Sequence, residues 1–229
     1  MNARPAALIY SGGHAHPFAQ TTQVLAEILS AAGYEVTVTE NYDEISASLG
    51  STRLLAINAL RWSMMQDDKY ARFRADHATA LTDRDIAPIG NFVAEGGRLL
   101  AIHTATICWD TAPAWRRLLG GGWEWGWSYH PPLGAVDIAI TSAGARLTGR
   151  GETFTVIDEA YHRLDPSSEC IVLAQIAAAE GLQPVAWLRR HGRGRVAVDA
   201  LGHDARSLGQ PDHALLLGSM IDWLGRDDA

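Results

Sequence analysis

Four histidines and one glutamate are the residues of this chain best suited to proton transfer. They are His16, His103, His130, Glu159 and His203, and each follows an expected strand or lies in a loop beside one. Imidazole exchanges protons near neutral pH, and a glutamate among apolar neighbours could have a raised pKa. Together they could take a proton from a substrate and return it. We predict His103, Glu159, His130 and His203 as catalytic residues, which only the tertiary fold could bring together.

Other interpretations of these residues remain open. The same groups could hold a divalent metal such as zinc, but the chain has no H-E-x-x-H sequence. No cofactor is therefore firmly implied, and we rank the metal below acid–base chemistry. In a purely structural alternative, Glu159 forms a salt bridge with Arg189 or Arg195, and Asp204 caps a turn after His203.

The segment 120–132 combines glycine, proline and tryptophan in a pattern that excludes a helix. Trp123, Trp125 and Trp127 alternate, so an extended chain would place all three on one side. Such aromatic faces can stack on the apolar faces of sugars, or they can fill a core or a subunit interface. We predict that the substrate-binding residues are His16, Trp109, Trp123, Tyr161 and Asp204.

Alternating apolar strands and amphipathic helices must position these residues. The expected strands cover 6–10, 34–38, 54–59, 99–102, 135–140, 154–157, 170–176, 184–188 and 196–201, with Asp199 pointing outward from the last. Helices are expected at about 18–32, 82–95 and 114–119 and at the end of the chain. This order predicts a parallel sheet with helices on both faces. His103 then lies at the carboxyl end of strand 99–102, where such sheets bind ligands, and the loop 60–78 crosses the same edge.

Composition narrows the class of protein further. The 229 residues are 47% hydrophobic and 20% charged, with a net charge of −7, which argues against nucleic acid as the main partner. The two cysteines form no C-x-x-C pair, and neither a signal peptide nor a membrane span is recognisable. We expect a cytoplasmic protein with one domain over 1–229, elaborated at about 121–190. A homo-oligomer could cover the tryptophans.

Several motifs follow one another in an order that is itself informative. They are Gly-Gly-Arg-Leu-Leu-Ala-Ile-His-Thr-Ala-Thr at 96–106, Gly-Gly-Gly-Trp before His130-Pro131, Asp-Glu-Ala-Tyr at 158–161, Pro-Val-Ala-Trp at 184–187, Gly-Arg-Gly-Arg-Val at 192–196 and Gly-His-Asp at 202–204. This set resembles the trehalose-utilisation (ThuA-like) family, within the class I glutamine-amidotransferase-like superfamily, over roughly the whole chain. The resemblance implies an α/β fold, a flavodoxin-like three-layer sandwich around a central, mostly parallel sheet.

The resemblance also implies a function. Members of the family are associated with bacterial sugar catabolism, including that of oxidised (keto) disaccharides. True amidotransferases carry a cysteine nucleophile at a strand-to-helix elbow, where this chain resembles them but has His103. Because imidazole cannot form the required thioester, we predict no glutaminase activity.

We therefore expect a carbohydrate-catabolism enzyme that acts on a small keto sugar or glycoside. The reaction would be an isomerisation, an epimerisation or an elimination, carried by His/Glu acid–base chemistry. The alternatives are a non-catalytic sugar-binding or interaction module and a metal-dependent hydrolase.

Overall fold

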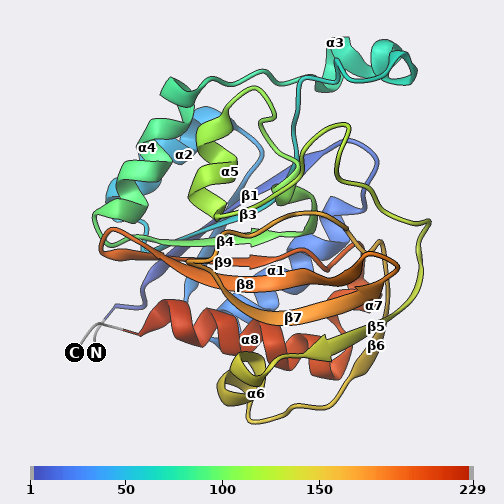
Figure 1. Ribbon diagram of the computed structural model, residues 1–229. Helices are drawn as coiled ribbons and strands as arrows, with labels where there is room; N and C mark the ends of the chain where they lie inside the picture. Colours follow the sequence, from blue (N-terminus) through green and yellow to red (C-terminus); the bar gives the residue numbers. More distant parts are fainter. Residues whose placement is uncertain (1–2, 227–229) are drawn as a thin grey trace.

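A computed structural model describes residues 3–226 of the chain (Figure 1). Its strands are β1 (Ala6–Gly13), β2 (Glu35–Thr39), β3 (Leu54–Leu60), β4 (Arg98–Ile102), β5 (Gly134–Ile140), β6 (Phe154–Asp158), β7 (Ile171–Ala178), β8 (Gly181–His191) and β9 (Gly194–Asp199). They form one sheet in the order β2-β1-β3-β4-β9-β8-β7-β5-β6. The pairs from β2 to β9 are parallel, whereas those from β9 to β6 are antiparallel.

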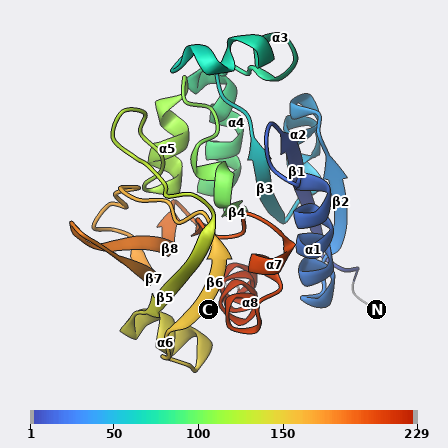
Figure 2. The ribbon, with the colours of Figure 1, turned by 90° about the vertical axis from the view of Figure 1, so that its right-hand side faces the viewer.

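The sheet is the middle layer of three (Figure 2). One face packs against α2 (Tyr42–Ser48), α4 (Asp83–Ala94) and α5 (Pro113–Leu119). The other packs against α1 (Phe18–Ala31), α6 (Ser142–Thr148), α7 (Ala205–Leu208) and α8 (Pro211–Gly225). Along β4, Leu99 and Ala101 join the first core and Leu100 and Ile102 the second, because successive side chains point to opposite faces. The predicted α/β sandwich is confirmed.

The sequence pattern locates the long elements and the short helix α5, but it misses other short helices. Helices α2, α6 and α7 have four to seven residues, too few for a helical period to stand out. The segment 60–78, expected as loop, contains a 3-10 helix (Asp68–Phe73) and the one-turn helix α3 (Arg74–His77). The antiparallel strands β5 to β8 fall largely within the segment expected to be an elaboration, 121–190.

One expectation about the sheet is wrong. Asp199 does not point outward: its side chain is fully buried and lies 2.9 Å from the imidazole of His213. Strand β9 is central, between β4 and β8, and helices cover both faces of the sheet there, so neither of its faces meets solvent.

None of the helices within residues 3–226 is long and apolar enough to cross a membrane.

Candidate functional site

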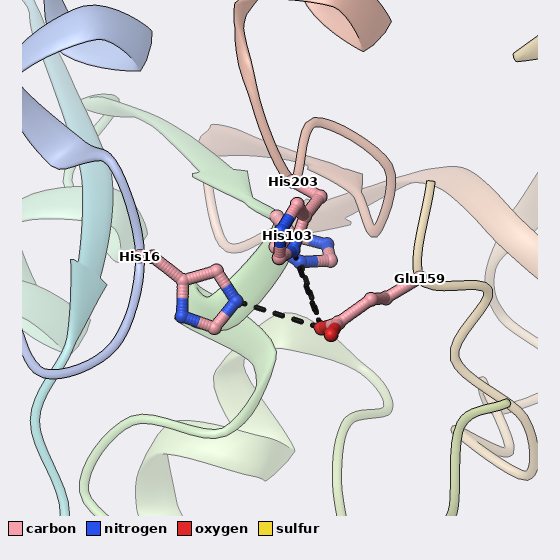
Figure 3. Close-up of side chains that lie close together, drawn as sticks. All are labelled: His16, His103, Glu159 and His203. Atoms are coloured by element: carbon pink, nitrogen blue, oxygen red, sulfur yellow. Dashed lines mark ion pairs between the residues drawn. The ribbon is translucent and has the colours of Figure 1, made fainter. Parts of the chain in front are cut away.

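Four of the five residues singled out for proton chemistry converge at the carboxyl edge of the sheet. His16 follows β1, His103 follows β4, Glu159 follows β6 and His203 follows β9 (Figure 3). Strand β6 runs in the same direction as β9, because four antiparallel pairings separate them. One ligand atom from each of the four residues lies within 4.8 Å of all the others. We call these four residues the His/Glu cluster.

Glu159 is the centre of the cluster. Its Oε2 lies 3.3 Å from His203 Nδ1, 3.6 Å from His16 Nε2, 3.8 Å from His130 Nδ1 and 3.9 Å from His103 Nε2. Burial alone would raise the pKa of this carboxyl, but the adjacent imidazoles of His16, His203 and His130 favour its charged form and hold the pKa well below its ordinary value. Glu159 is therefore ionised throughout the neutral range.

This arrangement corrects the expectation of a raised pKa for Glu159. Apolar sequence neighbours do not set the pKa, because imidazoles from other strands reach the carboxylate first. The alternative salt bridge with Arg189 or Arg195 is also not formed among the described residues. Arg189 pairs instead with Glu169 at 3.2 Å, and Arg195 donates to the carbonyl oxygen of Trp223.

His103 is held as a neutral imidazole with a defined tautomer. Its Nδ1 lies 2.9 Å from the carbonyl oxygen of Ala200, which can only accept, so Nδ1 carries the proton. Burial and the neighbouring His16 lower its pKa well below the ordinary value. Nε2 is left as an acceptor facing Glu159, with the Tyr161 hydroxyl at 3.1 Å. The residue adopts φ +46°, a strained conformation for a side chain of this size, as expected at a strand-to-helix elbow.

Two other ring nitrogens of the cluster are buried and unsatisfied. His16 Nε2 and His203 Nδ1 have no hydrogen-bond partner of acceptable geometry among the residues that the structure describes. Both face the Glu159 carboxylate at ion-pair distance. The negative charge of the Glu159 carboxylate, at this distance, raises the pKa of His203. Buried polar atoms normally find a partner, so these two atoms point to a species that the protein atoms alone do not supply.

A cavity of about 460 Å³ opens beside the cluster. His16, Glu159 and His130 line its polar end. The rest of the wall is largely aromatic, and its rings touch one another in sequence; it is formed by Tyr161, Trp123, Trp125, Trp62 and Tyr70. A larger cavity of about 650 Å³ lies elsewhere, at the C-terminal end of α5, among Arg116, Arg117 and Arg189.

Seven of the nine predicted site residues belong to the cluster or adjoin this cavity, and two do not. Trp109 lies in the core, 1% exposed, with its ring 4.5 Å from that of Trp115. Asp204 is the N-cap of α7 and accepts hydrogen bonds from the backbone N–H groups of Arg206 and Ser207. For Asp204, the turn-capping alternative describes what the side chain does.

Trp127 departs from the expected row of three tryptophans. A turn interrupts the extended chain, with the N–H of Trp127 donating to the carbonyl oxygen of Glu124 at 3.0 Å and Gly126 at φ +84°. Trp127 is 48% exposed and donates its indole N–H to Asp165. Only Trp123 and Trp125 of the row therefore line the cavity.

The sequence pattern does not single out some of the residues that lie around the site. Trp62 and Tyr70 were not predicted to bind, although the polar excursion at 60–78 was the available signal. Asp158 and Ser207 are buried beside the cluster and were assigned no role. Asp158 directly precedes Glu159 in a motif, but nothing in its sequence position indicates burial.

Solved structures with the same fold match nearly the whole chain. A ThuA-like protein from Parabacteroides merdae matches with a TM-score of 0.74 at 14% identity, covering 96% of this chain and 90% of that one. Another from Bacteroides uniformis has a TM-score of 0.70 at 15% identity, covering 100% and 95%. The cold-adapted β-galactosidase from Rahnella sp. R3 matches at 0.62 and 16%, covering 97% of this chain but 31% of the enzyme. Identities this low establish the fold alone.

Comparison at the sequence level identifies the family. No curated protein matches the chain. The family model described as trehalose utilisation, ThuA, matches residues 6–224, which include every member of the His/Glu cluster. The chain therefore belongs to the ThuA family, whose description places it in carbohydrate metabolism.

Proposed function

We propose that the chain is an enzyme that performs proton transfer on a small keto sugar or glycoside at the His/Glu cluster. The observation that carries this proposal is the junction of the cluster with an aromatic cavity. Aromatic rings suit the apolar faces of a sugar ring, and the polar end offers groups that bind and exchange protons. Family membership supports a carbohydrate as the class of substrate.

We further infer that the cluster holds a divalent cation, with zinc as the first candidate. Three imidazole nitrogens and one carboxylate oxygen form a donor set typical of zinc. His103 is neutral and its Nδ1–H is fixed by a backbone carbonyl, as metal-binding histidines generally are. The two unsatisfied nitrogens of His16 and His203 would gain a partner. The sequence alone places metal binding below metal-free acid–base chemistry, and this fit makes metal binding the stronger hypothesis.

A bound divalent cation would supply Lewis acidity toward a carbonyl or hydroxyl oxygen of the sugar. The protein residues have separate tasks. Glu159 is a weak base because its pKa is low, so it serves better as a ligand and counter-charge than as the proton acceptor. His130 lines the cavity and lies outside the four-residue cluster, so it is our candidate for moving the proton α to the carbonyl. Tyr161, beside His103, would donate to the substrate oxygen.

A cation held by the His/Glu cluster would also favour a second candidate function, a metal-dependent hydrolase of a glycoside. Zinc sites of this type activate water for attack. The two functions differ in their products: hydrolysis releases two fragments, whereas isomerisation or epimerisation keeps the molecular formula. A non-catalytic sugar-binding module would give no product at all.

The experiment is a substrate screen in D₂O. Purified protein, either zinc-loaded or chelator-treated, is incubated with simple and oxidised disaccharides, and the products are followed by mass spectrometry. We expect solvent deuterium in a product of unchanged carbon skeleton. His103→Ala and Glu159→Gln should each lower turnover by about a hundredfold or more. The control His191→Ala, at the opposite end of the β8–β9 pair from His203, should leave it unchanged. Sugar binding without any product would contradict the proposal.

A further inference from the structure

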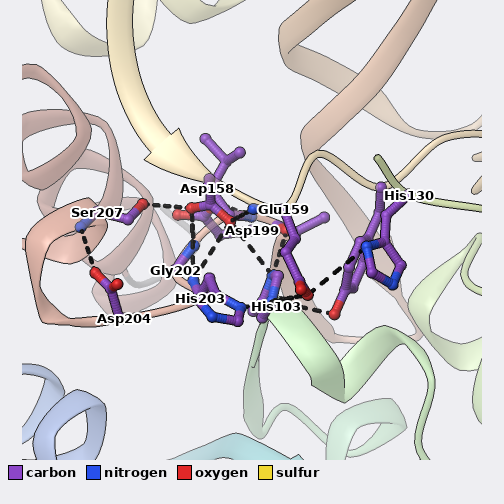
Figure 4. Close-up of polar contacts among 12 residues, drawn as sticks. His103, His130, Asp158, Glu159, Asp199, Gly202, His203, Asp204 and Ser207 are labelled. Atoms are coloured by element: carbon purple, nitrogen blue, oxygen red, sulfur yellow. Dashed lines mark hydrogen bonds and ion pairs between the residues drawn. The ribbon is translucent and has the colours of Figure 1, made fainter. Parts of the chain in front are cut away.

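A second group of polar side chains is buried directly behind the His/Glu cluster. Asp158 and Asp199 end strands β6 and β9, while Ser207 and His213 come from α7 and α8. All four side chains are fully buried, and none of them is a member of the cluster. Figure 4 shows the side chains of Asp158, Asp199 and Ser207 next to those of His103, Glu159 and His203. Buried polar groups are costly unless they are paired, so a connected set at this position requires an explanation.

The carboxylate of Asp158 contacts three of the four cluster residues. It accepts the backbone N–H of Glu159 at 2.8 Å and lies 3.4 Å from the backbone N of His203. It also accepts the N–H of Gly202 at 2.8 Å and lies 3.8 Å from Nδ1 of His103. Glu159 follows β6, Gly202 and His203 follow β9, and His103 follows β4. One buried carboxylate therefore links the three chain segments on which the cluster is built.

Ser207 in turn holds Asp158. Its hydroxyl donates to Oδ2 of Asp158, the same oxygen that accepts the N–H of Gly202. The position of Ser207 is fixed from the other side by His213, whose Nδ1 lies 2.8 Å from the Ser207 carbonyl oxygen. His213 Nε2 is bonded to Asp199 at 2.9 Å. The chain of contacts thus runs from a buried His–Asp pair through Ser207 to the cluster.

We propose that Ser207 is a positioning residue which, through Asp158, sets the relative placement of His103, Glu159 and His203. The inference rests on the proposed function, because the placement matters only if the cluster binds a ligand. Without the Ser207 hydroxyl, Oδ2 of Asp158 loses its side-chain donor, and a buried carboxylate short of donors turns toward other partners. The nearest are His103 Nδ1 and the backbone of His203, so the cluster would change its geometry.

Zinc affinity measures this effect. Chelator-treated wild type, Ser207→Ala and Ser219→Ala are titrated with Zn²⁺ by calorimetry. Loss of an outer hydrogen bond to a metal site weakens binding by about ten- to a hundredfold, which is the result expected for Ser207→Ala. Ser219 is the control, because its hydroxyl donates to the carbonyl oxygen of Leu215, in its own helix, at 2.8 Å. Asp158→Asn should weaken zinc binding in the same direction.

A readout that does not involve metal separates this proposal from the proposed function. The imidazole ¹⁵N signals of His103 and His203 are recorded in the chelated proteins and assigned with single-histidine variants. We expect Ser207→Ala to shift both signals and Ser219→Ala to shift neither. If the wild type binds no zinc, the metal part of the proposed function is wrong, and the ring signals still decide the role of Ser207.

A purely structural role predicts a different pattern. Ser207→Ala would then lower the melting temperature but leave both ring signals and the zinc affinity of the folded protein unchanged, which would overturn the proposal. If Ser207→Ala does not fold, Ser207→Cys keeps most of the side-chain volume and replaces the hydroxyl with a weaker donor. The same comparisons then apply to that variant.

Discussion

The Nδ1 atom of His203 lies 3.3 Å from Oε2 of Glu159, although their strands, β9 and β6, are not neighbours in the sheet. It is the shortest of the four imidazole contacts that this carboxylate makes. The contact raises the pKa of His203 and helps to lower that of Glu159. An ionised carboxylate surrounded by imidazole nitrogens supports the cation site that we propose.

The first prediction concerns metal and stability. Adding Zn²⁺ to the chelator-treated protein should raise its melting temperature, because a ligand that binds only the folded state stabilises it. At a free zinc concentration of about 100 times Kd the gain is about 2.7 kcal/mol. Glu159→Gln should abolish most of the shift, since it removes the one anionic ligand of the cluster. The control Glu27→Gln, exposed on α1, should keep it. An equal shift in both variants would place the zinc elsewhere.

The second prediction tests the aromatic wall of the cavity. Trp125 lines the cavity and Trp127, two residues later, does not. Trp125→Ala should raise the KM for the sugar found in the screen by about tenfold, equivalent to ~1.4 kcal/mol of binding, with kcat nearly unchanged. Trp127→Ala should alter neither constant. Steady-state kinetics on both variants measure the two constants. If Trp125→Ala had the same KM as Trp127→Ala, the sugar would not contact Trp125.

The third prediction concerns pH and the buried pair His213–Asp199. Burial lowers the pKa of His213, but the Asp199 carboxylate outweighs this, so the folded-state pKa is raised above 6.5. The pair therefore adds stability below 6.5 that is lost as the pH rises through the folded-state value. His213→Gln should cost about 3 kcal/mol near pH 5.5 and progressively less at alkaline pH.

Urea unfolding across this pH range measures the effect. The control His77→Gln alters a side chain that lies in α3, well away from the pair in sequence and fold. If the stability curves of wild type and His213→Gln ran parallel at all pH values, the charged pair would not exist in the folded protein.

The fourth prediction concerns glutamine and thiol chemistry. His103 occupies the elbow after β4, and Cys108 is buried with its Sγ donating to the carbonyl oxygen of Ala59. Burial raises the pKa of the Cys108 thiol to about 12, so hardly any nucleophilic thiolate forms. We expect no ammonia release from glutamine and slow alkylation of Cys108 by iodoacetamide in the native protein. Rapid labelling of Cys108 at neutral pH would contradict this description.

The sequence by itself predicts the long elements and the edge of the sheet at which the candidate site residues gather. Four apolar residues followed by His103 indicate a buried strand that ends in a histidine, and parallel strands present their carboxyl ends together. The same local pattern predicts that His16, Glu159 and His203 follow strands. Such inferences succeed because side-chain periodicity depends on neighbours within a few residues.

Only the tertiary structure determines the distances between the site residues and the charged groups that surround each of them. The order of the strands, which sets β9 beside β4 and carries β6 to the far edge, has no local signature in the chain. It determines that imidazoles rather than apolar groups surround Glu159, and this reverses the expected sign of its pKa shift. It also buries Asp199, while a single turn at Gly126 directs Trp127 away from the cavity. Electrostatic effects depend on separation in space, and a sequence specifies only separation along the chain.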